Sequence, residues 1–337
     1  MTTLRNRQVR LKSRPQGIPQ ADNFNIVEVP VEPLGAEQIL VRNIYLSVEP
    51  AMRGWVSDVG NYSEPVAIDA VMRAITVGRV EQSNDPRYHV GDIVTGMLGW
   101  QDYAAVTAAT IERKVGAGFP ISTALGVLGI NGITAYFGLL EAGQPKASDT
   151  VVVSTAAGAV GSTVGQIAGI KGARTVGITG GADKVKLCTE EFGYAAAVDY
   201  KAADFEAALD AACPNGIDLY FDNTAGAISD AVYQRLNVNA RVVICGTASV
   251  ASWSPPPLGP RVERIILTKR VRVQGFVVFD LLARYGEALQ QLGKWVKSGE
   301  LRYREDILDG IEAAPDAIAG LYRGDNFGKR LIRIAAE

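Results

Sequence analysis

Three small residues at fixed spacing follow the apolar segment 151–154. Ala156, Gly158 and Gly161 form the pattern A-x-G-x-x-G directly before a segment that is typical of a helix. Small residues at such a turn let the backbone approach a pyrophosphate, and the first amides of the helix point at its negative charge. A second predicted strand (174–179) follows at the right distance, so the pattern predicts a dinucleotide-binding site. A glycine-rich turn in a flavodoxin-like domain without a nucleotide is the alternative.

The end of the second predicted strand distinguishes the two nicotinamide cofactors. A site for NAD usually places Asp or Glu about 20 residues after the glycine turn, bonded to the ribose hydroxyls. Here the strand ends in Thr179, Gly180 and Gly181, and no carboxylate holds that place. Lys184 is the nearest cation for a 2′-phosphate, whereas Asp183 is suited to capping the next helix. The sequence therefore predicts NADP(H), with a solvated helix lysine as the alternative for Lys184.

Length, composition and charge describe an ordinary globular enzyme. The chain has 337 residues, 47% hydrophobic and 21% charged, which predicts about two domains. Its formal net charge of −2 gives no reason to expect nucleic acid or an anionic membrane as a partner. No apolar run reaches the roughly 18 residues of a membrane span, and the polar N-terminal segment lacks the apolar core of a signal peptide. We therefore expect a cytoplasmic protein that acts on a small molecule.

The histidine and cysteine content limits the metal chemistry. His89 is the one histidine, and the three cysteines (Cys188, Cys213 and Cys245) are widely spaced. They cannot build the catalytic zinc site of an alcohol dehydrogenase, and no C-x-x-C cluster is present for a structural zinc. An odd number of scattered cysteines also argues against a disulfide framework. The sequence therefore predicts no metal site, and it lacks the G-x-S-x-G motif of a hydrolase.

The first third of the chain consists of short β-like segments. Glycine and proline separate them, and no long helical period interrupts them, which predicts a mostly β domain in the form of a small barrel. These segments lie at 26–30, 38–48, 77–83, 92–97 and 103–108.

Strands and helices alternate in the middle of the chain, after a segment at 123–142 that is typical of one helix or two short ones, with Gly129 and Gly132 as breakers. The six predicted strands lie at 151–154, 174–179, 195–199, 217–222, 241–246 and 271–278. Six such strands match a complete doubly wound parallel sheet of an α/β domain. Long helices are predicted at 281–298 and 311–323, and a last strand at 330–334 is expected to return to the β domain. The predicted domains are thus 1–122 with 300–337, and 123–299.

Several segments resemble the medium-chain dehydrogenase/reductase superfamily. They are AAGAVGSTVGQIA (156–168), NGITAYFGLL (131–140), FDNTAG (221–226) and GDNFGKRL (324–331). Within it they resemble the zinc-free NADPH-dependent alkenal and prostaglandin reductases, which include plant double-bond reductases and bacterial curcumin reductase. The resemblance covers nearly the whole chain in order. It implies a GroES-like β barrel and a Rossmann domain with NADPH in the cleft between them, and a homodimer through the edge strand at 271–278.

The resemblance also implies a set of residues that contact NADP(H). They are Ala157, Gly158, Ala159, Val160, Gly161, Lys184, Tyr200, Asn223, Cys245, Gly246, Phe276, Val278 and Asn326. The turn residues would hold the pyrophosphate, and Lys184 and Tyr200 would flank the adenosine phosphate. Cys245 and Gly246 would line the nicotinamide. The residues themselves leave other roles open: packing for Tyr200 and Phe276, a helix cap for Asn223, and a simple turn for Asn326.

The segment YLSVEPAMRGW (45–55) resembles the substrate side of these reductases. It implies a pocket formed by Ala51, Met52, Arg53 and Trp55. Relatives commonly have a tyrosine at the place of Ala51, and another a few residues past Cys245, where Val250 and Ala251 stand. These departures predict a roomier or more apolar pocket. Tyr62 is the remaining local hydroxyl and the predicted proton donor, with a tyrosine at a loop rim as the alternative.

The activity implied by the resemblance is reduction of the C=C bond of α,β-unsaturated aldehydes and ketones. Hydride from NADPH would attack the β-carbon, and negative charge would develop on the carbonyl oxygen. Because the cofactor positions are intact and the substrate positions are altered, two alternatives remain. One is an NADPH:quinone reductase of the same superfamily, and the other is a non-catalytic NADPH-binding redox sensor.

Overall fold

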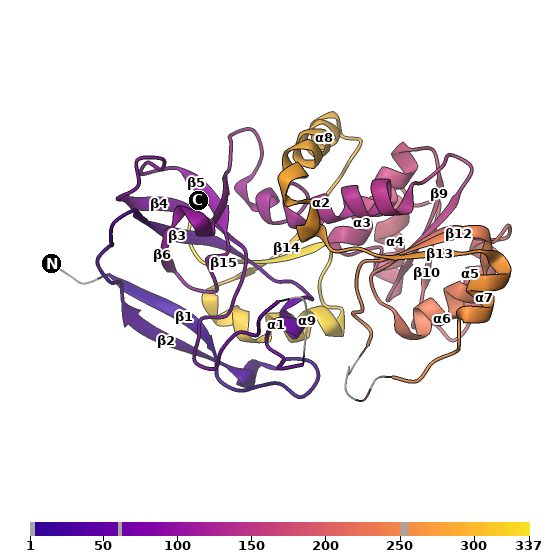
Figure 1. Ribbon diagram of the computed structural model, residues 1–337, viewed down its shortest axis with the longest axis horizontal. Helices are drawn as coiled ribbons and strands as arrows, with labels where there is room; N and C mark the ends of the chain where they lie inside the picture. Colours follow the sequence, from indigo (N-terminus) through magenta and orange to yellow (C-terminus); the bar gives the residue numbers. More distant parts are fainter. Residues whose placement is uncertain (1–3, 60–62, 251–254, 256) are drawn as a thin grey trace. The chain divides into compact units, whose positions relative to one another are not determined.

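The computed structural model describes residues 4–59, 63–250, 255 and 257–337 (Figure 1). Contacts divide the chain into two compact units. The first, called the β unit here, comprises Met1–Leu125, Glu305–Asn326 and Arg330–Glu337. The second, called the α/β unit, comprises Gly126–Arg304 and Phe327–Lys329. The predicted fold class, a β domain with a parallel-sheet α/β domain, is confirmed.

Strand β3 (Gln38–Ser47) is the centre of the β unit. It pairs antiparallel with β4 (Thr76–Ser83), β6 (Tyr103–Thr107) and β15 (Lys329–Arg333). The sheet order is β14-β15-β3-β4-β5-β7, with β5 at Ile93–Gly96, β7 at Ile111–Lys114 and β14 at Glu305–Asp309. Strands β1 (Arg5–Leu11) and β2 (Phe24–Pro30) form a separate antiparallel pair. The late strand therefore returns to the β domain as predicted.

The β unit also contains short helices. They are α1 (Met52–Trp55), α9 (Ala314–Arg323), η1 (Ala21–Asn23), η2 (Ala108–Thr110), η3 (Ile121–Leu125) and η6 (Ile311–Ala313). Residues of α1, η6 and α9 are part of the apolar core of the unit. Met52 of α1, Ile318 of α9 and Trp100 are fully buried in one apolar cluster. Burial of such side chains contributes roughly 1.5–3 kcal/mol each to the free energy of unfolding.

The α/β unit contains a six-stranded sheet in which all pairings are parallel. Its order is β10-β9-β8-β11-β12-β13. The strands are β8 (Thr150–Ser154), β9 (Arg174–Thr179), β10 (Ala196–Asp199), β11 (Ile217–Asp222), β12 (Leu236–Ile244) and β13 (Arg272–Gly275). Every residue of β8 is buried, which fits a central strand covered on both faces.

Helices follow the strands of this sheet. They are α2 (Ile130–Phe137), η4 (Gly138–Gly143), α3 (Ala159–Ile170), α4 (Ala182–Glu190), α5 (Phe205–Ala212), α6 (Gly226–Gln234), α7 (Glu263–Lys269), η5 (Val278–Arg284) and α8 (Tyr285–Ser298). Helix α2 packs against both α3 and α8 (Figure 1). Among the described residues, none of the helices has the length and apolarity needed to cross a membrane.

Several predicted elements differ from the structure, among them the fifth strand, which runs from Leu236 to Ile244 rather than from 241 to 246. The segment 123–142, expected as one helix or two short ones, is divided into η3, α2 and η4. Gly129 is the N-cap of α2 and so marks a break as expected, whereas Gly132, the other expected breaker, lies inside the helix. At the position of Gly132 only glycine fits, because a Cβ there would lie 1.9 Å from the carbonyl oxygen of Val127. The sixth strand is shorter than predicted, and the long helix after it begins at Tyr285.

Candidate cofactor and substrate sites

The strand order reverses between β8 and β11. In open parallel sheets, ligands bind at such a switch point, beyond the carboxyl ends of the strands. The predicted cofactor residues follow these ends: 157–161 after β8, Lys184 after β9, Tyr200 after β10, Asn223 after β11, and 245–246 after β12. Because all the strands run in the same direction, these residues lie along one edge of the sheet.

The first turn of α3, which follows the turn after β8, leaves its amides available to an anion. Gly158 is the N-cap of α3, and no side chain caps the helix. The amides of the first turn therefore have no partner within the helix. A Cβ on Gly161 would lie 2.2 Å from the carbonyl oxygen of Thr155, so the close turn requires glycine there. This geometry fits a pyrophosphate, which gains from the positive end of the helix dipole.

The segment Phe327–Lys329 lies against this turn. The amide of Gly328 donates to the carbonyl oxygen of Ala157 at 3.0 Å. The Phe327 ring centroid lies 5.4 Å from Lys184 Nζ and 5.6 Å from the guanidinium carbon of Arg304. Lys184 and Arg304 therefore both lie close to the ring of Phe327, and the next residue, Gly328, contacts the glycine turn. Sequence reasoning missed both Phe327 and Arg304, although Phe327 stands next to Asn326, which the structure assigns to the β unit.

Two glycines, Gly180 and Gly181, directly follow β9, so neither of these positions carries an acidic side chain of its own. A Cβ on Gly180 would lie 2.9 Å from Tyr200 Cε1 and 3.0 Å from Lys201 Cε. Tyr200 is 42% exposed, so its ring does not belong to the core. Lys201 lies over that ring, with Nζ 5.9 Å from its centroid, and is a cation that sequence reasoning missed.

Asp199 connects the loop after β9 to the loop after β10. Its Oδ1 accepts hydrogen bonds from the amides of Gly181 and Lys201, both at 2.9 Å. The loops after β9 and β10 are thus held together by one carboxylate. Asp183 lies in the first turn of α4, but the helix has no side-chain cap, so the capping role expected for it is wrong.

Asn223 links β11 to β8. Its Nδ2 donates to the carbonyl oxygen of Ser154 at 2.7 Å, and its backbone amide donates to Ser154 Oγ at 2.8 Å. The N-cap of α6 is Ala225, so Asn223 is not a helix cap. Its side-chain nitrogen is therefore engaged within the sheet.

Cys245, Phe276 and Val278 follow the next strands. Burial, with a smaller effect of the Asp222 charge, raises the pKa of the Cys245 thiol to about 12. The thiol is therefore protonated at neutral pH and unsuited to nucleophilic attack. The amide of Phe276 donates to the carbonyl oxygen of Ile244 at 3.0 Å, which extends the pairing of β12 and β13, and Val278 is buried.

The predicted substrate segment forms α1 of the β unit. Met52 is fully buried in the core, and Trp55 is also buried. The Arg53 guanidinium lies 5.1 Å from the ring centroid of Tyr322 and is buried. Ala51 is the half-buried residue of the four, so it is the most accessible to a substrate. Tyr62, the predicted proton donor, lies outside the described residues, as does Ala251.

Comparisons with known proteins agree with this two-part architecture. Residues 7–113 match a family described as the N-terminal domain of oxidoreductase, and residues 159–294 match one described as zinc-binding dehydrogenase. An NADPH-dependent curcumin reductase of Escherichia coli is 45% identical, with 99% of this chain and 98% of that protein covered. A 2-alkenal reductase (NADP(+)-dependent) of Nicotiana tabacum is 37% identical, with 98% of each chain covered.

The crystal structure of CurA in complex with NADPH from Vibrio vulnificus has a TM-score of 0.93 and 43% identity, and covers 98% of this chain and 100% of that chain. The chain belongs to the medium-chain dehydrogenase/reductase superfamily. Although one matched family of this superfamily is described as zinc-binding, the described part of this member has no group of three or more His, Cys, Asp or Glu side chains that could hold a metal ion.

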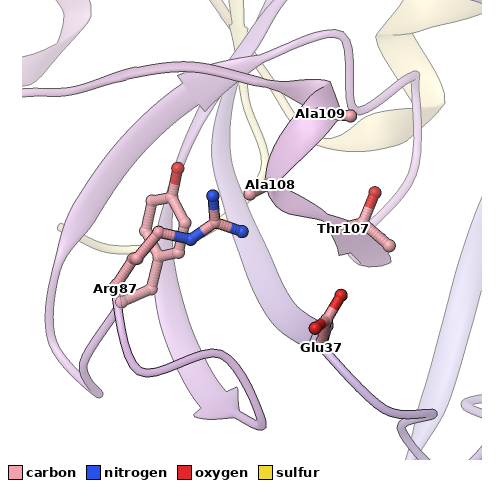
Figure 2. A pocket seen from close by; sticks show the side chains of 6 residues that line it. Glu37, Arg87, Thr107, Ala108 and Ala109 are labelled. Atoms are coloured by element: carbon pink, nitrogen blue, oxygen red, sulfur yellow. The ribbon is translucent and has the colours of Figure 1, made fainter.

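A pocket of about 450 Å³ lies on the β unit of this superfamily member (Figure 2). It is lined by Glu37, Arg87, Tyr88, Thr107, Ala108 and Ala109. The Arg87 guanidinium is already paired with Asp85 at 2.6 Å. None of the predicted site residues is among these lining residues, so we assign the pocket no part in the reaction.

Proposed function

We propose that this protein is an NADPH-dependent reductase of the C=C bond of α,β-unsaturated aldehydes and ketones. The observation that supports it most is the edge of the parallel sheet, where an uncapped helix follows the glycine turn and the two residues directly after β9 are glycines rather than Asp or Glu. Relatives at 45% and 37% identity over nearly the whole chain are an NADPH-dependent curcumin reductase and an NADP-dependent 2-alkenal reductase.

The cofactor residues divide into three groups in this proposal. Residues 157–161 bind the pyrophosphate through the first turn of α3. Lys184 and Tyr200 bind the 2′-phosphate, because Lys184 lies in the first turn of the helix after β9 and Tyr200 lies beside Gly180. Residues 245–246 line the nicotinamide, together with Phe276 and Val278, and the proposal includes Asn223 and Asn326 as further contacts.

Bound NADPH supplies the hydride that reduces the β-carbon of the substrate. Charge then develops on the carbonyl oxygen, where loss of one hydrogen-bond donor can cost about 3 kcal/mol. Tyr62 is the proposed proton donor to the α-carbon. Ala51 lacks the ring that relatives commonly place there, so the proposal favours substrates with a bulky group next to the enone.

Steady-state NADPH oxidation tests this proposal. We expect turnover with trans-2-alkenals and aryl enones, with saturation of the α,β-bond shown by mass spectrometry of the product. The Tyr62→Phe variant should retain NADPH affinity and lose kcat. Turnover with quinones alone would replace the proposal by a quinone reductase, and tight NADPH binding without any turnover would replace it by a redox sensor.

We also propose a cytoplasmic homodimer. Strand β13 is the last strand of its sheet, and Val277, Phe279 and Leu282 beyond it are exposed by 37%, 45% and 61%. An unpaired edge next to exposed apolar side chains is suited to pairing with a second copy. Three free cysteines support a reducing compartment.

A further inference from the structure

The carboxylate of Asp222 is buried at the switch point of the sheet, with 2% of the residue exposed. It is the last residue of β11 and accepts hydrogen bonds from neutral donors. The Oδ1 atom accepts from the amides of Thr224 and Ala225 at 2.9 and 2.8 Å and from Tyr220 OH at 3.0 Å. The Oδ2 atom accepts from Ser229 Oγ at 2.6 Å. Bonds to a charged acceptor are roughly twice as strong as neutral ones, so this group holds its own loop firmly.

The same carboxylate connects β11 to β8. Ser154 Oγ, at the end of β8, donates to Asp222 Oδ1 at 3.4 Å and accepts the amide of Asn223 at 2.8 Å. The Asn223 side chain then donates to the carbonyl oxygen of Ser154. Because the glycine turn begins at the next residue, Thr155, its starting point is set by this connection.

The backbone of Asp222 connects β11 to β12. Its carbonyl oxygen accepts from the amides of Cys245 and Gly246 at 2.8 and 3.1 Å. On the side of β11, Ala225 has a φ of 57°, a left-handed conformation that costs alanine energy and that the bond from its amide to Oδ1 maintains.

We propose that Asp222 is a positioning residue for the cofactor: its carboxylate fixes the ends of β8 and β11, and its backbone carbonyl joins β12 to them, so that the three ends form one preorganised surface. This inference rests on the proposed function, since the surface is the one assigned to NADPH. A surface that is already ordered spares the ligand the entropy of ordering it, and the gain is seen in affinity. Removing the carboxylate should therefore weaken cofactor binding in addition to lowering the stability of the fold.

The test compares two buried aspartates at opposite ends of the same sheet. Asp149 directly precedes β8, is also buried, pairs with Arg241 and accepts the amide of Lys146 at 2.7 Å. Both Asp222→Ala and Asp149→Ala should lower the melting temperature. We expect only Asp222→Ala to raise the Kd for NADPH, by tenfold or more, in a fluorescence titration of the full chain, while Asp149→Ala stays within twofold of wild type.

If Asp222→Ala fails to fold, a milder variant tests whether this connection affects NADPH binding. Ser154→Ala removes one hydroxyl and leaves the carboxylate in place, and we expect a severalfold rise in both the Kd and the KM for NADPH, with an unchanged KM for the enone. A folded variant of either kind that binds NADPH as wild type does would overturn the inference. Wild-type protein that binds no NADPH would instead overturn the proposed function.

Discussion

Lys184 is the residue on which cofactor choice depends most directly. It lies in the first turn of α4, and its ammonium is 5.4 Å from the Phe327 ring centroid. We predict that Lys184→Ala weakens NADPH binding about tenfold, or about 1.4 kcal/mol, because a charge-assisted bond to the 2′-phosphate is lost. NADH binding should change less than twofold, since NADH lacks that phosphate.

Lys186→Ala is the matched control for this measurement. Lys186 lies in the same helix, but its ammonium pairs with Glu190 at 3.9 Å and both side chains are exposed. Titrations with both nucleotides should give wild-type Kd values for this variant. Equal losses for NADPH and NADH in Lys184→Ala would contradict the assigned role.

We predict that buried Cys188 makes the free energy of unfolding fall as the pH rises above 9. Burial raises the pKa of this thiol from 9.0 to about 12, with the Lys184 charge opposing the shift. The native state stays protonated where the unfolded chain ionises, so this stability is present below pH 9 and is lost progressively as pH rises towards 12. At pH 10 the loss is about 1.4 kcal/mol. Urea unfolding at pH 8 and pH 10 should show a smaller difference in Cys188→Ala than in wild type, and an equal difference would rule out this origin.

Local motifs were predictable from the sequence, whereas contacts between residues far apart in the chain were not. The motif around Gly158 predicted a glycine turn between a strand and a helix, and β8 and α3 flank that turn, because glycine spacing is a local property. The bond from Asn223 to Ser154 spans 69 positions and depends on strand register, so no local pattern indicates it. Lys201 was overlooked because a lysine in a polar loop is typical of a solvated surface.

Helix α3 packs tightly against Tyr194 in the loop before β10. The hydroxyl of Tyr194 donates to the carbonyl oxygen of Gly161 at 2.6 Å, and a Cβ on Gly165 would lie 2.1 Å from Tyr194 Cζ. We predict that Gly165→Ala lowers the free energy of unfolding by about 1–3 kcal/mol, because the buried ring has to move. It should also weaken NADPH binding, since the bond at Gly161 holds the first turn of α3.

Gly169→Ala in the same helix provides the comparison. A Cβ there meets no atom within 4 Å, so the better helix propensity of alanine should leave stability unchanged or raise it by about 0.5–1 kcal/mol. Chemical denaturation of both variants measures the difference. Equal stabilities for the two variants would contradict the packing argument.

Regular elements were predicted best where the apolar pattern is strong. All six strands of the parallel sheet were found, since buried strands consist of β-branched runs such as that of β8. Strand β1 (Arg5–Leu11) was missed because arginine, asparagine and glutamine dominate it, and its pairing with β2 is what makes it a strand. Within 123–142, the break at Gly129 was expected, but Gly132 lies inside α2, where its close approach to Val127 depends on tertiary packing.

The assembly of the whole molecule depends on the edge of the parallel sheet. We predict that wild type has twice the chain mass of 35.9 kDa in light scattering, and that Phe279→Asp with Leu282→Asp converts it to the single mass. Charges placed in an apolar interface are left unpaired on association, which is costly. Val238→Asp, at a residue 52% exposed within β12, should leave the mass unchanged. Wild type with the single mass would refute the dimer.

The last strand divides its residues between the two units: Lys329 belongs to the α/β unit, and Arg330 and the residues after it belong to the β unit. Its partner β3 is formed early in the chain, and the nearby bond from Tyr45 to Glu337 spans 292 positions. A nascent polypeptide on the ribosome therefore leaves Tyr45–Ser47 of β3 without their partner β15 until that strand has been made. We expect folding of the β unit to be slow and to be completed only after β15 is available, while the α/β unit can gain structure earlier and chaperones protect the incomplete β unit.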